Sequence, residues 1–141
     1  MARAKLLIVP VLVLATACGY FKSGTWEDDP KNFRRAWGVP PPEGMNVIHS
    51  WYRRSAHFTR EEVYYFELVG DPAFAEAFAE VNNMATADPA TLEGHGFCFD
   101  RPEWFAPEHP DRYHVWVGPR RSSLVLREEE SDRIFVYACQ L

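Results

Sequence analysis

Residues 63–70 read VYYFELVG. This stretch is rich in β-branched and aromatic side chains and ends at Gly70, a pattern that predicts a β-strand. The segment before it, Val47 to Arg54, predicts a second strand, because its side chains alternate between two faces. One face carries Val47, His49, Trp51 and Arg53, and the other carries Ile48, Ser50 and Tyr52. We expect the loop around residues 56–60 to pair the two strands.

The main helix is expected directly after this strand, where Asp71 and Pro72 provide a start signal. Four apolar side chains then recur at helical spacing and predict one buried stripe: Phe74, Phe78, Val81 and Ala85. Glu76 and Glu80 lie off this stripe. We expect the helix to end near Asn83.

A shorter helix is expected upstream of both strands. It begins at Asp29 and Pro30, because Asp is a favoured N-cap and proline is favoured at the first helical position. Phe33 and Trp37 lie four residues apart and therefore share one face of this helix. Gly38 follows and predicts its end.

The last third of the chain predicts three further strands. They cover Tyr113 to Val117, Leu124 to Arg127 and Ile134 to Cys139, with an acidic turn between the last two. Residues 86–111 are rich in proline, glycine and acidic side chains, and we expect a long irregular segment there. Runs of strands with few helices between them indicate the α+β class. We therefore expect an antiparallel sheet of about five strands, with the main helix and the short N-terminal helix packed on it.

The first 18 residues resemble the signal peptide and lipobox of a bacterial lipoprotein. Arg3 and Lys5 supply the basic start, residues 6–14 supply the apolar run, and residues 15–17 are the small residues before Cys18. The apolar run is too short for a transmembrane helix, which needs about 20 residues. An ordinary signal peptide cut near Ala17 and a buried helix of a cytosolic protein are the alternatives.

This resemblance implies cleavage before Cys18 and lipidation of its sulfur, so that a lipid anchor attaches the chain to a membrane. Gly19 stands where an Asp would favour retention in the inner membrane. The resemblance therefore implies the outer membrane, with the domain facing the periplasm, and the inner membrane or the cell surface as alternatives. We expect a signal peptide over residues 1–17, a lipidated tether over 18–29 and a single globular domain over 30–141.

The charge of the chain argues against nucleic acid as a partner. The formal net charge of the full chain is −5. Removing residues 1–17 takes away Arg3 and Lys5, which leaves 13 of the 15 basic side chains against all 20 acidic ones, a net charge of −7. Nucleic-acid phosphates require a basic surface, and a polybasic contact with anionic lipid requires a run of basic residues. The acidic balance of the chain argues against both kinds of contact.

Cys98 and Cys139 form an even pair once Cys18 carries lipid. Such a pair in an oxidising compartment favours a disulfide. The bridge would connect the long irregular segment to the last strand, and bridges of this kind typically contribute about 2–4 kcal/mol. The alternative is two buried free thiols, because cysteine also serves as a small core residue.

Polar side chains cluster around the first two strands. His49 and His57, with a carboxylate such as Glu67, are candidate zinc or copper ligands. Three further histidines are candidates for additional ligands: His95, His109 and His114. The alternative is a solvated sheet face with Arg–Glu salt bridges. The chain has no nucleophile elbow, and we expect neither a catalytic residue nor a resident cofactor.

Aromatic side chains make up 15% of the chain. Trp104 and Phe105 stand in the long irregular segment, and large aromatic residues on ordered loops are common interface anchors. We expect these two residues, with Trp51, Tyr52 and Arg53, to form a binding platform for a protein or a sugar ring. The alternative is that the aromatic residues fill the core.

Two hypotheses about function remain. The first is a non-catalytic lipoprotein that binds another component of the cell envelope, with a protein as the expected partner and a glycan as the other ligand class. The second is a metal-binding or metal-dependent envelope protein that uses His49 and His57. The mature domain resembles small bacterial lipoproteins without an assigned activity, and this resemblance implies no activity.

Overall fold

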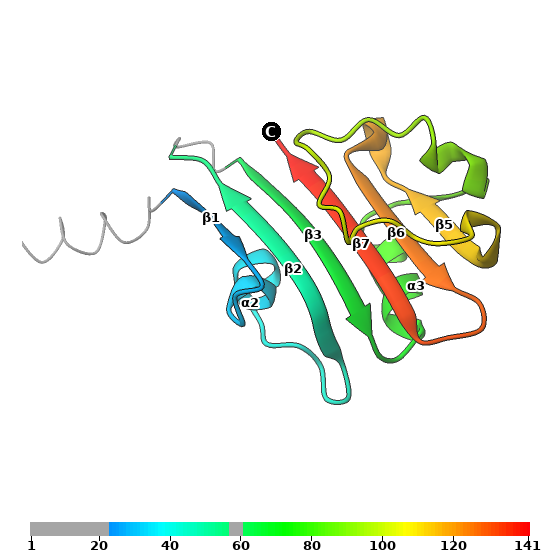
Figure 1. Cartoon of the computed structure of the whole chain (residues 1–141), viewed down its shortest axis with the longest axis horizontal. Coiled ribbons are helices and arrows are strands. Elements are labelled where there is room, and N and C mark those ends of the chain that lie inside the picture. Colours follow the sequence, from blue (N-terminus) through cyan, green and yellow to red (C-terminus); the bar gives the residue numbers. More distant parts are fainter. Residues whose placement is uncertain (1–22, 57–60) are drawn as a thin grey trace, which may run out of the picture.

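The computed structural model describes residues 23–56 and 61–141. Within these ranges the chain forms one antiparallel sheet of seven strands in the order β1-β2-β3-β7-β6-β5-β4, with two α-helices (Figure 1). The α+β class and the antiparallel sheet are confirmed, whereas five strands is too few. The signal segment over residues 1–17, Cys18 and His57 lie outside the described residues.

The order of the elements explains the sheet. The elements are β1 (Gly24–Glu27), α2 (Asn32–Trp37), β2 (Asn46–Arg54), β3 (Glu62–Val69), α3 (Ala73–Val81), β4 (Ala85–Ala87), β5 (Tyr113–Val117), β6 (Ser123–Glu128) and β7 (Arg133–Gln140). Three short 3-10 turns, η1 (Pro89–Leu92), η2 (Pro110–Arg112) and η3 (Pro119–Arg121), lie between the later strands. β7 returns to the centre of the sheet and pairs with β3 along eight residues.

The two central strands are buried on both faces. Residues 62–68 of β3 are all buried, and so are residues 134–139 of β7. The alternation expected for the last strand is confirmed: Ile134, Val136 and Ala138 face one cluster, and Phe135, Tyr137 and Cys139 face the other. Because both faces carry apolar side chains, both faces must be covered to exclude water.

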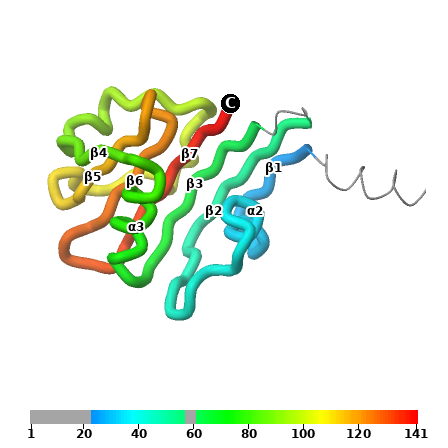
Figure 2. The backbone as a smooth tube through the Cα atoms, turned by 180° about the vertical axis from the view of Figure 1, so that it is seen from behind, coloured from blue at the N-terminus to red at the C-terminus, as the bar shows by residue number. Residues whose placement is uncertain are grey.

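The two helices cover one face of the sheet (Figure 2). Phe33 and Trp37 of α2 share a face as expected, with ring centroids 4.2 Å apart, and the Trp37 ring lies 4.6 Å from the ring of Phe66 on β3. Gly38 ends the helix with a φ of 75°, and its N–H donates to the carbonyl oxygen of Arg34. No helix in the described part of the chain has the length and the apolar run needed to cross a membrane.

The segment between β4 and β5 covers the other face. It crosses in front of β7 in Figure 1, and its buried or half-buried side chains include Leu92, Phe97, Phe99, Trp104 and Phe105. These side chains pack against the inward residues of β3, β6 and β7, among them Tyr65, Leu124 and Tyr137. The irregular segment expected over residues 86–111 is therefore a layer of the core, and its beginning belongs to β4.

Residues 24–27 form a strand and not the tether that was expected over residues 18–29. They pair with residues 51–54 of β2. The physical reason is Trp26, which packs against the helix-side cluster with its ring 5.9 Å from the ring of Tyr52. Pairing with β2 and the packing of Trp26 together attach this short edge strand to the core.

Two expectations about side-chain faces were wrong. A register shift between Val47 and His49 interrupts the alternation of β2, so Val47 packs on the helix side and not beside Trp51. A bulge of this kind adds one residue and reverses the faces that precede it. In α3, Val81 is 80% exposed, because Ala75 and Ala79 fill the inward positions beside Phe74 and Phe78.

We expect the substitution Phe66→Ala to destabilise the domain by about 3–5 kcal/mol, because it removes a fully buried ring from the helix-side core. The matched control Val81→Ala should change the free energy of unfolding by less than about 0.5 kcal/mol, because this side chain is exposed. Urea unfolding followed by tryptophan fluorescence measures both values. Equal losses in the two variants would contradict the assignment of Phe66 to the core beneath the helices and of Val81 to the exposed face of α3.

Candidate functional site

The segment between β4 and β5, which we call the irregular cover, encloses the cluster around Tyr65 and Tyr137, which we call the second core. Aromatic side chains of the irregular cover meet β2 at the rim of this second core. The ring centroids of His49 and Trp104 lie 5.3 Å apart in a stacked arrangement. The Nδ1 atom of His49 also lies 3.3 Å from Oδ2 of Asp28, which follows β1. A strand, a turn and a loop far apart in the sequence therefore meet at this histidine.

The next two residues on this face of β2 continue the arrangement. The ring centroid of Trp51 lies 6.3 Å from that of Phe99, and the guanidinium carbon of Arg53 lies 4.2 Å from the Phe99 ring centroid. A cation over an aromatic face is attracted by the ring quadrupole. We call the surface formed by His49, Trp51, Arg53, Phe99 and Trp104 the β2 aromatic surface.

The structure brings together three of the five expected binding residues. Trp51 and Trp104 are half-buried and Arg53 is exposed. Tyr52 and Phe105 are fully buried, with 0% of each residue exposed. The expectation that these two residues bind a partner is corrected, because Tyr52 faces the helix-side core and Phe105 faces the second core.

Tyr52 has a structural role at the end of β2. Its hydroxyl accepts hydrogen bonds from Nε and Nη2 of Arg54, at 3.0 and 2.7 Å. Arg54 also contacts Oε1 of the buried Glu62 at 3.1 Å. Burial, together with a contribution from Glu62, raises the pKa of Tyr52 to about 12. The hydroxyl therefore remains protonated at neutral pH and serves this network.

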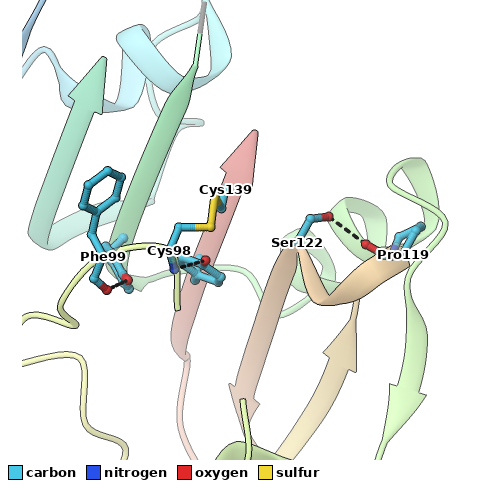
Figure 3. The surroundings of a disulfide bond; sticks show 7 residues. Cys98, Phe99, Pro119, Ser122 and Cys139 are labelled. Atoms are coloured by element: carbon cyan, nitrogen blue, oxygen red, sulfur yellow. Dashed lines mark hydrogen bonds between the residues drawn. A yellow bond between two sulfur atoms is a disulfide. The ribbon is translucent and has the colours of Figure 1, made fainter. Parts of the chain in front are cut away.

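Three contacts attach residues 97–99 of the cover to the sheet (Figure 3). Cys98 and Cys139 are joined by a disulfide, the N–H of Cys98 donates to the hydroxyl of Tyr137 at 3.0 Å, and the hydroxyl of Tyr65 donates to the carbonyl oxygen of Phe99 at 3.0 Å. Burial raises the pKa of both tyrosine hydroxyls. The loop that supplies Phe99 and Trp104 is thereby attached to the centre of the sheet.

The expected metal ligands do not assemble in the described residues. These residues contain no group of three His, Cys, Asp or Glu side chains that could hold a metal ion. His49 meets Asp28, whereas the Glu67 carboxylate lies 3.3 Å from Arg133. His114 instead pairs with Glu129, with Nε2 3.2 Å from Oε1. His109 is exposed on the turn before β5.

His95 is a core residue of the irregular cover. It is 6% exposed, and neither ring nitrogen has a hydrogen-bond partner among the described residues. Its ring contacts those of Phe97 and Tyr137, with centroids 5.0 and 5.7 Å away. Burial, with a smaller contribution from the charge of Arg121, lowers the pKa of His95. The imidazole is therefore neutral at pH 7.

The comparisons with known proteins identify no relative. No protein-family model matches the chain, and neither the curated proteins nor the solved structures contain a match.

Sequence reasoning missed Phe99 and the partner of His49. The alternation of β2 did place His49, Trp51 and Arg53 on one face, which was the available signal. Phe99 carried no signal, because its position depends on the path of a long segment across the sheet.

Reduction of the disulfide is expected to lower the free energy of unfolding by about 2–4 kcal/mol, since the bridge joins residues 41 positions apart. Urea unfolding with and without dithiothreitol measures this difference. The double variant Cys98→Ala/Cys139→Ala should be insensitive to dithiothreitol. An unchanged midpoint for the natural domain after complete reduction would show that the other contacts attach the cover without the bridge.

Stability should also fall as the pH is lowered from 7.5 to 5.5. Because the pKa of His95 is lowered in the folded state, the unfolded chain binds a proton more readily below about pH 6.5. The variant His95→Leu should lose less stability over this range than the natural protein does. Urea midpoints at both pH values provide the measurement. An equal pH dependence in His95→Leu would contradict the assignment.

Proposed function

We propose that this protein is an extracytoplasmic lipoprotein, anchored through Cys18, whose domain binds another cell-envelope protein through the β2 aromatic surface. One observation carries the binding role: Trp104 is partly exposed and stacks on His49, in a segment that the disulfide and two tyrosine hydroxyls attach to the sheet. The anchor rests on the resemblance of residues 1–18 to a lipoprotein signal.

The disulfide supports a location outside the cytoplasm. Cys98 is exposed and its partner Cys139 is buried. A bridge that begins at an exposed residue is subject to reduction by cytosolic thiols, whereas oxidising compartments such as the periplasm preserve it. The signal segment and the disulfide thus favour the same compartment on independent grounds.

The nature of the surface supports a protein partner. Tryptophan and arginine are enriched among the residues that dominate binding energy in protein interfaces. Here the stacked and cation–π contacts fix Trp104 and Arg53 before any partner arrives, which reduces the entropy lost on binding. The cavity that touches Arg53 and Phe99 has a volume of about 120 Å³, well below the roughly 300–1,000 Å³ of small-molecule sites. A shallow aromatic surface of this kind suits a protein better than a small ligand.

The substitution Trp104→Ala should weaken partner binding by about 2 kcal/mol or more, roughly thirtyfold, as expected for an interface anchor. The measurement is mild crosslinking of the lipidated protein in its native membrane, followed by pull-down and mass spectrometry. We expect one dominant partner whose yield depends on Trp104.

Two controls accompany this experiment. Trp116→Ala removes a half-buried tryptophan that packs on the helix side, and it should leave capture intact once both variants are shown to fold by their thermal unfolding. Cys18→Ser should reduce capture if the anchor brings the domain to its partner. Equal capture by Trp104→Ala and the natural protein would remove the β2 aromatic surface from the proposal. Retention on isolated sacculi that depends on Trp104, without a protein partner, would instead identify a glycan ligand.

A further inference from the structure

A second surface lies at one end of the sheet, beside the disulfide. It is an open cavity of about 920 Å³ between residues 96–98 of the cover, the turn over residues 119–122 and the end of β7. Figure 3 shows this region, with the disulfide between the cover and β7, and with Pro119 and Ser122 on the neighbouring turn. The lining shares no residue with the β2 aromatic surface.

The charged side chains of this lining are both positive. Arg120 and Arg121 line the cavity, and no Asp or Glu side chain does, although the whole chain has a net charge of −5. Arg121 donates from Nη1 to the carbonyl oxygen of Gly94 at 3.1 Å and keeps its other donors. Arg120 is exposed and has no partner among the described residues. The cavity therefore offers unused guanidinium donors to an anion, and its two positive charges outnumber the one negative charge of the Leu141 α-carboxylate.

The backbone of the turn holds these two arginines in an unusual conformation. Arg120 and Arg121 have φ values of 56° and 59°, a region that glycine and asparagine occupy with less strain. Hydrogen bonds within the turn maintain it, from Arg121 N–H to the carbonyl oxygen of Gly118 and from the Ser122 hydroxyl to that of Pro119. Glycine or asparagine would fit this backbone with less strain, so what arginine contributes at these two positions is its positive charge.

The cavity lies at the end of the sheet where the described chain begins. Gly24 of β1 is opposite Arg54, Arg54 is opposite Glu62, and Glu62 is opposite Gln140 in the cavity lining. Figure 1 shows the start of β1 and the end of β7 at the same end of the sheet. Cys18 precedes Gly24 by six residues, which span at most about 20 Å. The turn over residues 119–122 directly precedes β6, and four strand spacings, about 19 Å, separate β1 from β6. This distance is comparable to the span of the six residues after Cys18.

We propose that this cavity binds the phosphate group of an anionic membrane phospholipid next to the lipid anchor. The proposal rests on the anchored lipoprotein proposed above. Guanidinium groups match phosphate oxygens in geometry and charge. The ring of Phe97, the disulfide and Leu141, which is 79% exposed, offer apolar contacts to the glycerol and the first acyl carbons. The acidic domain as a whole is repelled by an anionic bilayer, so this local pair of charges also orients it.

The test uses the rate at which dithiothreitol reduces the disulfide, because the bridge lines the cavity and an occupant shields it. The mature lipidated protein is inserted into vesicles of phosphatidylcholine alone or with phosphatidylglycerol. Protection follows 1 + [L]/Kd, so we expect reduction to be about threefold slower where the accessible phosphatidylglycerol reaches twice its dissociation constant. Equal rates in the two vesicle types would overturn the proposal.

Variants separate the cavity from general surface charge. Arg120→Gln and Arg120→Asn should both abolish the difference between vesicle types, and asparagine tolerates the backbone conformation of the turn. The control Lys31→Gln should keep the difference. Protection that persists in both Arg120 variants would show that the negative vesicle surface repels the dithiothreitol thiolate and that no binding site is involved. This result would overturn the proposal.

A further arm distinguishes a lipid from a free phosphate compound. Glycerol 3-phosphate added to the protein in neutral detergent probes the phosphate chemistry alone. Protection by glycerol 3-phosphate without protection by phosphatidylglycerol would overturn the lipid assignment. The intact mass of the purified protein reports the anchor separately. A mass without lipid overturns the proposed anchor, whereas a lipidated protein without protection overturns only this site.

Discussion

The fold depends on a central pair of strands that is apolar on both faces. Residues 62–68 of β3 and 134–139 of β7 are buried without interruption, so neither face of the sheet can be left to water. Burial contributes roughly 25 cal/mol for each Å² of apolar surface removed from water, which makes both covers necessary to stability. The helices provide one cover and satisfy their own backbone hydrogen bonds. The other cover is irregular, and its backbone has to be ordered by other contacts.

Those contacts explain why the irregular cover is also the source of the β2 aromatic surface. Ordering a backbone residue costs about 1–2 kcal/mol of conformational entropy, and the cover offsets this with buried aromatic rings, two tyrosine hydroxyls and the disulfide. Phe105 points into the core and carries the packing. Trp104, one residue earlier, remains half-exposed at the rim against His49. A cover fixed for stability therefore also presents a rigid tryptophan.

The sequence predicted the parts of this structure that depend on local pattern. The alternation of β7 assigned its six side chains correctly to two cores, and Phe33 with Trp37 defined the face of α2. It did not predict features that depend on distant contacts. β1 has four residues and depends on its pairing with β2 and on the packing of Trp26. The bulge of β2 reverses the face of Val47. Phe105 lies in the core and Trp104 at its rim because of the path that the cover takes across the sheet. For the candidate site, the β2 residues were predictable and Phe99 was not.

The disulfide connects the two surfaces that carry the proposals. It attaches the segment that presents Trp104, and it also lines the cavity that contains Arg120 and Arg121. The cavity lies at the end of the sheet where β1 begins, whereas the β2 aromatic surface lies on the broad face of the sheet. An anchored domain that meets a bilayer with this end would leave the broad face accessible to a partner. Leu141 lines both this cavity and the pocket beside Arg53 and Phe99, so the two surfaces adjoin. Loss of the bridge would disturb both through the same segment.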